Sequence, residues 1–187
     1  MNYYVELAKS AVENYIKEKK IVSPASDLPE EISKRKAGTF VTIEKDKELR
    51  GCIGTYLPTR TNIAEEIIHN AIAAATEDYR FDSIKAEELP QLSYTVYILS
   101  EPQVVRDVKE LDPRKFGIIV KTAPFTYPNQ DVVFDGHVPF KSGLLLPDLE
   151  GVDTIEKQFL IACQKGGIDP EREKVFIYRF SVEKHNE

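Results

Sequence analysis

Residues 49–55, with the sequence LRGCIGT, bring together the side chains in this chain that are best suited to chemistry. They supply a thiol, a guanidinium and a hydroxyl. Strand alternation places Arg50 and Cys52 on one face. A guanidinium beside a thiol lowers the thiol pKa and favours the nucleophilic thiolate. The segment therefore predicts Cys52 as a candidate nucleophile and Arg50 as the stabiliser of its thiolate. A structural role for Cys52 stays equally open, because free cysteines are often buried.

Two glycines in the same segment predict recognition rather than simple core filling. A glycine inside a strand usually marks a bulge or the close approach of a ligand or another backbone. Segments 40–44 and 53–56 have strand composition, and residues 45–48 between them are polar, so we expect a hairpin. The candidate ligand- or partner-binding residues are Leu49, Gly51, Ile53, Gly54 and Thr55, together with Asp78 and Arg80 from a later loop.

That later loop, residues 76–82, is rich in charged and aromatic side chains. Asp78 and Arg80 are expected to form an ion pair, which either only orders the turn or lines the site beside Cys52. His69 is interpreted as a surface or satisfied histidine. His137 is weighed as an acid or base, since histidine titrates near neutral pH, against a polar loop position.

The elements that must position these residues follow from periodicity. Apolar residues at helical spacing predict amphipathic helices over residues 4–16 and after Asn62, where Glu65 completes a capping box. A third helix is expected from Asp153 or Thr154 to about residue 165, and residues 21–36 are expected to form a loop with a short helical piece. Alternating or continuous apolar runs predict strands over residues 92–99, 116–120, 144–146 and 175–180.

Residues 123–140 are interpreted as a lobe extension or lid, because prolines, glycines and aromatic residues are concentrated there. Within this segment, residues 131–134 are expected to form a short strand, followed by a turn at Asp135 and Gly136. The basic run 34–36 is either a solvated edge or a site that holds an anionic ligand near the hairpin.

Composition restricts the class of protein. At 187 residues the chain is expected to be one domain with two lobes. The net charge of −6 disfavours unspecific phosphate binding. Two distant cysteines and three histidines have no metal-ligand spacing, so we expect neither a metal site nor a cofactor. The start of the chain does not resemble a signal peptide, and no apolar run is long enough to span a membrane, so a cytoplasmic protein is expected.

The segment LRGCIGT resembles the signature of the AMMECR family, and further similarities occur at GTFV (38–41), DYRF (78–81), GLLLP (143–147) and DLEGVDT (148–154). The resemblance covers residues 4–182. Tyr79 stands where many members have proline, and residues 123–140 resemble an insertion. The family implies a two-lobed domain with the signature near a cleft, and it implies no established reaction. Bacterial members resemble the first component of a system that also contains a Memo-like protein and a radical-SAM protein.

These observations predict an α+β domain over residues 1–187. Two unequal lobes are expected, with mixed or antiparallel sheets, three to four flanking helices and a cleft between the lobes. The cleft residues are expected to be Arg50, Cys52, Thr55, Asp78 and Arg80. Two functions stay open. The favoured one is a ligand- or partner-binding component that acts with radical-SAM and Memo-like proteins through residues 49–55. The alternative is an enzyme that uses the Cys52 thiolate for redox or covalent chemistry. Nucleic-acid modification is a third, weaker hypothesis.

Overall fold

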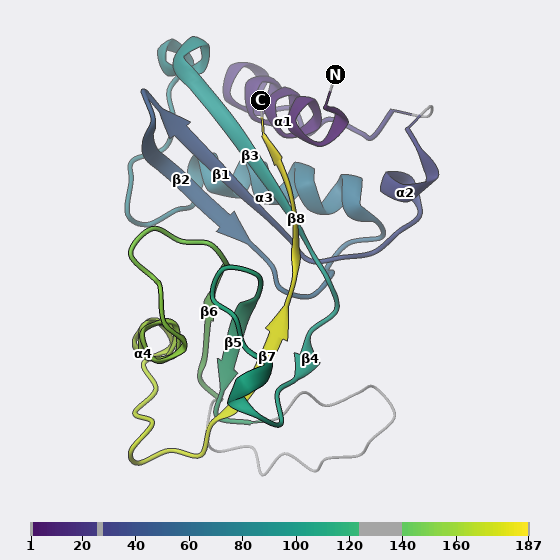
Figure 1. Ribbon diagram of the computed structural model, residues 1–187. Coiled ribbons are helices and arrows are strands. Elements are labelled where there is room, and N and C mark those ends of the chain that lie inside the picture. Colours follow the sequence, from purple (N-terminus) through teal and green to yellow (C-terminus); the bar gives the residue numbers. More distant parts are fainter. Residues whose placement is uncertain (1, 26–27, 124–139, 187) are drawn as a thin grey trace. The chain divides into compact units, whose positions relative to one another are not determined.

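The computed structural model describes residues 2–25, 28–123 and 140–186 (Figure 1). The chain forms two compact units. Unit 1 comprises the residues up to Ser100 together with those from Glu183 onward, and unit 2 comprises Glu101–Val182. Each unit combines helices with a four-stranded sheet, and the strand pairs are antiparallel. The predicted α+β class is confirmed. The cleft between lobes stays a prediction, and all the candidate site residues lie in unit 1.

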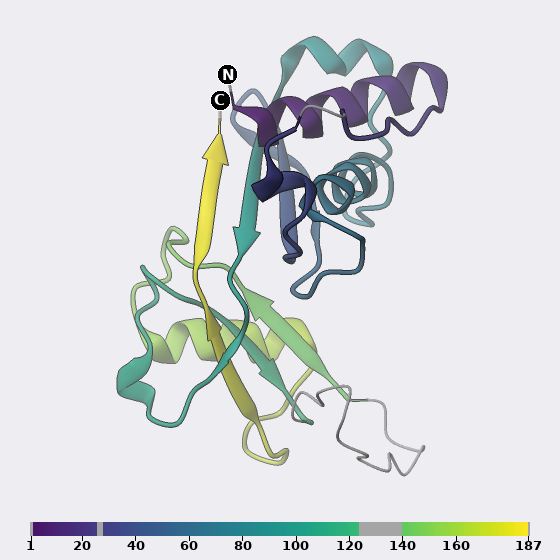
Figure 2. The same cartoon turned by 90° about the vertical axis from the view of Figure 1, so that its right-hand side faces the viewer.

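Unit 1 is a sheet with helices on one face, as Figure 2 shows edge-on. The strands follow in the spatial order β2 (Glu48–Gly54), β1 (Thr39–Lys45), β3 (Leu92–Leu99) and β8 (Val182–Asn186). Helix α1 (Tyr3–Glu18) contacts β3, and α3 (Ile63–Thr76) contacts both β1 and β2. A short helix α2 (Glu30–Ser33) and the 3₁₀ helix η1 (Ala86–Gln91) complete the unit. Among the strands of the described residues, β2 is the last on its side, so one of its edges has no neighbouring strand there.

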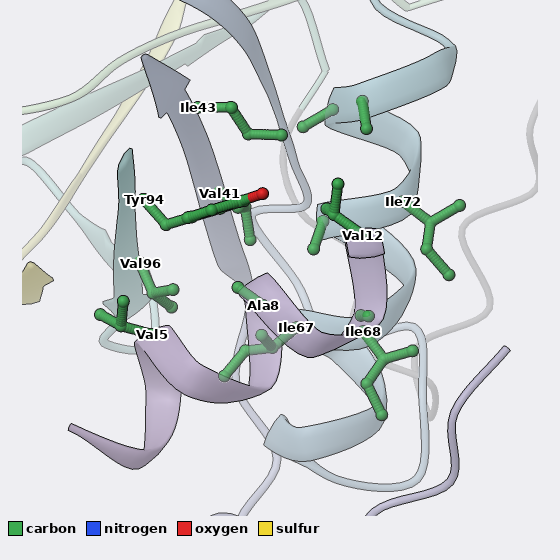
Figure 3. Packing of buried hydrophobic residues seen from close by; sticks show 14 of the residues in the cluster. Val5, Ala8, Val12, Val41, Ile43, Ile67, Ile68, Ile72, Tyr94 and Val96 are labelled. Carbon is green, nitrogen blue, oxygen red and sulfur yellow. The ribbon is translucent and has the colours of Figure 1, made fainter. Parts of the chain in front are cut away.

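The apolar faces predicted from helical spacing form the core of unit 1. Figure 3 shows α1 and α3 packed against inward-facing residues of β1 and β3, including Val41, Ile43 and Val96. Burying one large aliphatic side chain contributes about 1.5–3 kcal/mol, whereas a typical hydrogen bond contributes about 1 kcal/mol net. Burial of apolar surface therefore holds the helices on the sheet, and polar contacts decide the finer positions of loops and strand edges.

The predicted hairpin is confirmed, with a shifted second strand. Asp46 and Lys47 both have positive φ, as in the two-residue turns whose twist matches that of a hairpin. The second strand begins at Glu48 and ends at Gly54, so the signature itself is the strand, and the segment expected over 53–56 lies mostly beyond it. The register shifts between Ile43 and Glu44, which makes Arg50 the extra residue of a β-bulge on β2.

Unit 2 contains the second sheet and the C-terminal helix. Its spatial strand order is β4 (Gln103–Val104), β7 (Phe176–Phe180), β5 (Gly117–Lys121) and β6 (Ser142–Leu145). Helix α4 (Ile155–Gly166) has Thr154, one of the two predicted caps, as its N-cap and Gly167 as its C-cap, and it packs on β5 and β6. The 3₁₀ helix η2 (Val108–Glu110) lies between β4 and β5. Strand β8, which joins the first sheet, was not predicted.

The predicted lid over residues 123–140, with its short strand, its turn and His137, lies almost entirely outside the described residues. Within the residues that the structure describes, no helix is long and apolar enough to cross a membrane.

Candidate functional site

The side chains of Asp78 and Arg80 occupy the free edge of β2 at Cys52. The Cys52 amide donates to Asp78 Oδ2 at 2.8 Å, and Arg80 Nη2 approaches the Cys52 carbonyl oxygen at 3.5 Å. The two side chains also bind each other, because Arg80 Nε donates to Oδ1 at 2.9 Å and Nη2 donates to Oδ2 at 2.6 Å. The predicted ion pair is therefore present, and it lies directly against Cys52.

The electrostatics of this pair follow from its geometry. The Arg80 guanidinium, helped by the amides of Cys52 and Arg80, lowers the pKa of Asp78 to about 2. The hydrogen bond to Asp78 raises the pKa of Arg80, and negative charge on Cys52 raises it further. Burial raises the pKa of Tyr97, and negative charge on Cys52 adds to that effect. The charge of Cys52 therefore contributes to the raised pKa of both Arg80 and Tyr97. The Thr42 hydroxyl lies 3.3 Å from Cys52 Sγ.

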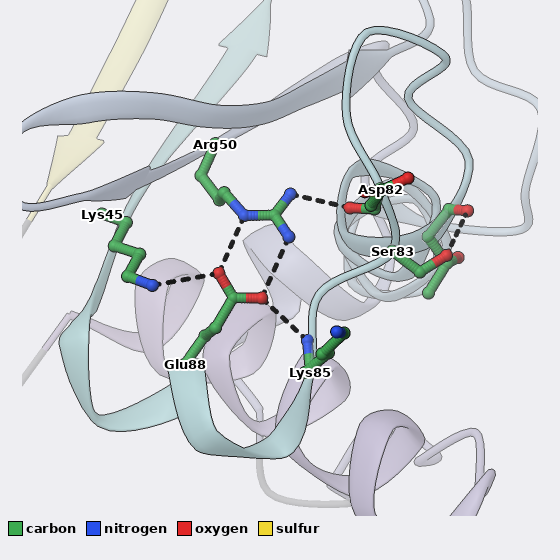
Figure 4. A network of polar contacts seen from close by, with 7 residues as sticks. Lys45, Arg50, Asp82, Ser83, Lys85 and Glu88 are labelled. Carbon is green, nitrogen blue, oxygen red and sulfur yellow. Dashed lines mark hydrogen bonds and ion pairs between the residues drawn. The ribbon is translucent and has the colours of Figure 1, made fainter.

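Arg50 does not take the position that strict alternation predicted. Its guanidinium grips Glu88 of η1 through two bonds of 3.0 Å, and Nη1 donates to the Asp82 carbonyl at 2.8 Å (Figure 4). Lys45 also binds Glu88, at 3.2 Å. The bulge at Arg50 breaks the period of two on which the prediction rested. The expected thiolate stabiliser therefore serves as an anchor for η1, and Arg80 is the arginine that contacts Cys52.

Phe81 links the two arginines. The guanidinium carbons of Arg50 and Arg80 lie 6.0 Å and 5.4 Å from the centre of its ring. Such cation–π contacts are worth about 0.5–1 kcal/mol at exposed sites. The segment between α3 and β3 is therefore attached to β2 at neighbouring points, by Asp78, Phe81 and Glu88.

A third carboxylate, Glu66 of α3, holds the loop that follows β2. Glu66 is only 1% exposed, and its carboxylate accepts four hydrogen bonds. The donors are the Thr55 hydroxyl at 2.6 Å, the Thr59 amide at 2.7 Å, the Thr59 hydroxyl at 2.8 Å and the Arg60 amide at 2.8 Å. Thr55, a predicted site residue, is therefore turned toward Glu66.

The two glycines of the signature are explained by packing. A Cβ at Gly51 would lie 2.1 Å from the carbonyl oxygen of Ala74 on α3, and a Cβ at Gly54 would lie 2.2 Å from the Phe40 ring. Neither position accepts a side chain without moving the neighbouring element. Ile53 packs against the core of unit 1.

Three large apolar residues on β2 or in the loops next to it are exposed. Leu49 lies near the start of the strand, Leu57 follows its end, and Tyr79 sits between the two residues bound at Cys52. The Tyr79 side chain is 94% exposed, although both of its neighbours are fixed. We call Leu49, Leu57 and Tyr79 the β2-edge surface. Three of the five large exposed apolar residues described in unit 1 belong to it; the other two are Tyr3 and Ile21.

The structure also shows the surroundings of the basic run 34–36 and of His69. In the basic run, Lys34 pairs with Glu30, and Arg35 pairs with Glu183 at 3.0 Å, as expected for a solvated edge. His69 lies on α3, where burial and the Arg60 charge lower its pKa. Among the described residues, no group of three histidine, cysteine or acidic side chains is arranged to hold a metal ion.

Sequence reasoning missed Glu66 and Glu88. Glu66 had a readable signal, since it and Asn70 are polar residues four apart within the apolar stripe of α3. Asn70 indeed binds the Thr39 carbonyl at 3.0 Å and the Thr39 hydroxyl at 2.8 Å. Glu88 carried no such signal, because it stands among other charged residues.

Comparison with known proteins now assigns the family. The AMMECR1 family profile matches residues 5–185. This chain belongs to the AMMECR1 family. The resemblance seen in the signature is therefore confirmed over nearly the whole chain.

Relatives of this AMMECR1 protein occur in bacteria and archaea. A Thermotoga maritima protein is 48% identical over 183 residues, which cover 97% of this chain and 96% of the relative. A Clostridium acetobutylicum protein is 40% identical over 98% of this chain, which spans only 36% of that longer relative. The crystal structure of an uncharacterized Pyrococcus horikoshii protein superposes with a TM-score of 0.81 at 30% identity, covering 98% of this chain and 89% of that one.

The clamp between Arg50 and Glu88 predicts acid sensitivity. Hydrogen bonds from Arg50 lower the pKa of Glu88 to about 2, so its contribution is complete above about pH 5 and is lost as the pH falls toward 2. We expect Glu88→Gln to lower the free energy of unfolding at pH 7 by about 2 kcal/mol. The variant should then lose less stability than the wild type between pH 5 and 2.

Urea unfolding at several pH values measures both effects. Glu87→Gln, at the exposed neighbouring position, is the control, and parallel pH profiles for all three proteins would contradict the prediction.

Proposed function

We propose that this AMMECR1-family protein is a partner-binding component, and that its partner docks on the β2-edge surface. The resemblance described above makes a radical-SAM protein and a Memo-like protein the candidate partners. The observation that carries the proposal is Tyr79. Its side chain is 94% exposed, while Asp78 and Arg80 on either side are bonded to Cys52.

The composition of this surface supports a binding role. Tyrosine and arginine are enriched among the residues that dominate binding energy at protein interfaces. Here Tyr79 is flanked by Arg80, and the guanidinium of Arg50 lies near the same Phe81 ring as that of Arg80. Isolated exposed apolar residues are normal on protein surfaces. Here one of them lies on β2, one in the loop after it and one between the two residues bound to Cys52, each next to a fixed carboxylate contact, and this grouping supports a role in recognition.

The way in which these residues are held also supports the proposal. Ordering a loop on binding costs affinity, and a surface that is already ordered avoids part of that cost. Leu49 adjoins the Arg50–Glu88 clamp, Tyr79 adjoins the Asp78 contact, and Leu57 lies in the loop held by Glu66. The anchors are therefore presented in fixed positions before a partner arrives.

The lengths of the relatives agree with a component role. The region matching this chain makes up 36% of the Clostridium acetobutylicum relative, so that protein carries further sequence beside it. The Thermotoga maritima relative matches over 96% of its own length. The same domain therefore occurs both with and without attached sequence, as expected for a module that works beside other protein parts.

The proposal predicts the effect of removing the Tyr79 ring. The purified protein would be titrated against the radical-SAM and Memo-like proteins of the same genome, and Kd measured by calorimetry. We expect Tyr79→Ser to weaken binding to one of them about tenfold or more, as for an interface hot spot. Tyr3→Ser, at a 52% exposed position on α1, is the matched control and should leave Kd unchanged. An unchanged Kd for Tyr79→Ser, or no binding of either protein by the wild type, would overturn the proposal.

A second candidate function, thiol chemistry at Cys52, is favoured by the contact with Arg80. Its guanidinium lies against the Cys52 backbone, and the Thr42 hydroxyl lies 3.3 Å from Sγ. A nearby positive charge favours the nucleophilic thiolate. Such a thiolate would attack one sulfur of a disulfide substrate, forming a mixed disulfide with Cys52 and releasing the other sulfur as a thiolate, and Arg80 would stabilise the Cys52 charge before the bond forms.

The pH dependence of Cys52 alkylation tests this second candidate. We expect Arg80→Gln to move the midpoint of iodoacetamide labelling upward by about 1 pH unit, because an opposite charge is removed from the vicinity of the sulfur. Arg50→Gln, which removes the same charge from the Glu88 clamp, is the control and should leave the midpoint in place. Cys52→Ser identifies the background from Cys163. Equal midpoints in the Arg80 and Arg50 variants would exclude the role assigned to Arg80.

A further inference from the structure

On the edge of β2 that has no neighbouring strand among the described residues, side chains contact the backbone of Cys52. Gly51, Cys52 and Ile53 are all paired in register with β1, opposite Ile43, Thr42 and Val41. The amide and carbonyl of Cys52 are contacted by the side chains of Asp78 and Arg80. In an antiparallel ladder, a residue of this kind exchanges both of its backbone hydrogen bonds with one residue of the next strand.

Asp78 and Arg80 supply the same two functions that an added strand would supply. The carboxylate takes the place of a strand carbonyl and accepts from the Cys52 amide at 2.8 Å. The guanidinium takes the place of a strand amide and approaches the Cys52 carbonyl at 3.5 Å. The pair is further joined by its own bonds of 2.6 Å and 2.9 Å, so both edge positions are filled by one preassembled unit.

The sequence of β2 explains why this edge needs protection. Proteins commonly protect edge strands with charged residues, prolines or bulges. The bulge at Arg50 disrupts the first half of the edge. From Gly51 to Leu57, however, the chain has neither a charged residue nor a proline, and it includes Ile53 and Tyr56. Side chains from the loop after α3 provide at Cys52 the protection that the strand itself lacks.

We propose that the Asp78–Arg80 pair is a plug that prevents β2 from pairing with β2 of a second copy of this chain. The second copy is the occupant favoured by geometry. A two-fold axis beside Cys52 would bring the strand against itself in antiparallel orientation, and Cys52 would lie opposite Cys52 of the other copy. Each amide would then donate to the other copy's carbonyl, so the edge is complementary to itself at this residue.

Self-association of a plug-less variant tests this inference. We expect Asp78→Ala combined with Arg80→Ala to shift the mass measured by light scattering from that of the 21.3 kDa chain toward twice that mass as concentration rises. Mild oxidation should then link the variant through Cys52, because opposite residues in such a pair have Cα atoms about 5.5 Å apart, which is within disulfide range. Adding Cys52→Ser should abolish the link and keep the dimer.

The matched control is Arg50→Ala combined with Glu88→Ala, which removes an ion pair of the same type away from the Cys52 backbone. It should associate no more than the wild type. Circular dichroism checks folding, and Asp78→Asn with Arg80→Gln serves if the alanine variant does not fold. A folded plug variant that associates no more than the wild type, or only as much as the control, would overturn the inference. The readout does not involve Tyr79 or a partner protein, so its failure is distinct from a failure of the proposed docking function.

Discussion

Backbone amides that lie outside the sheet ladder and the helices must still find acceptors, and in unit 1 buried or half-buried carboxylates provide them. Asp78 accepts from the amide of Cys52 on the free edge of β2, and Glu66 accepts from the amides of Thr59 and Arg60 in the loop that follows. A buried amide left without an acceptor costs about 1–3 kcal/mol. The position of each segment around the signature is therefore determined by an acidic side chain from another element, the loop after α3 for Cys52 and α3 itself for Thr59 and Arg60.

Burying carboxylates is costly unless each one is fully satisfied. Asp78 and Glu88 each accept two hydrogen bonds from an arginine, whereas Glu66 accepts four hydrogen bonds, none of them from a cationic side chain of the described residues. Apolar residues of similar size would give comparable stability, but they would not hold the loops and the strand edge in one orientation. The arrangement is therefore best understood as one that positions the surface. It keeps the β2-edge surface ordered, closes the strand edge at Cys52, and brings Arg80 to the Cys52 backbone.

The fold was largely predictable from sequence, because it depends on local periodicity. Alternating apolar residues located β3, helical spacing located α1 and α3, and the caps Asn62 and Thr154 marked two helix starts correctly. The site was less predictable. Arg50 was expected beside Cys52, and a one-residue bulge next to Gly51, whose exact position the sequence does not specify, directed it to Glu88 instead. The glycines were predicted to mark a bulge or the close approach of a ligand or another backbone. The structure shows close backbone approach, by Ala74 of α3 at Gly51 and by Thr39 at Gly54, and only the tertiary structure identifies these neighbours.

Amide hydrogen exchange tests most directly whether these carboxylates hold the signature in place. The amides of Cys52, Thr59 and Arg60 donate to acidic side chains rather than to a strand or helix ladder. We expect them to exchange at least about tenfold more slowly than the unstructured chain, because each is released only when its clamp opens. Protection of the Cys52 amide should be lost in Asp78→Ala and retained in Glu66→Gln. Exchange of all three amides at the rate of an unstructured chain in the wild type would contradict the account.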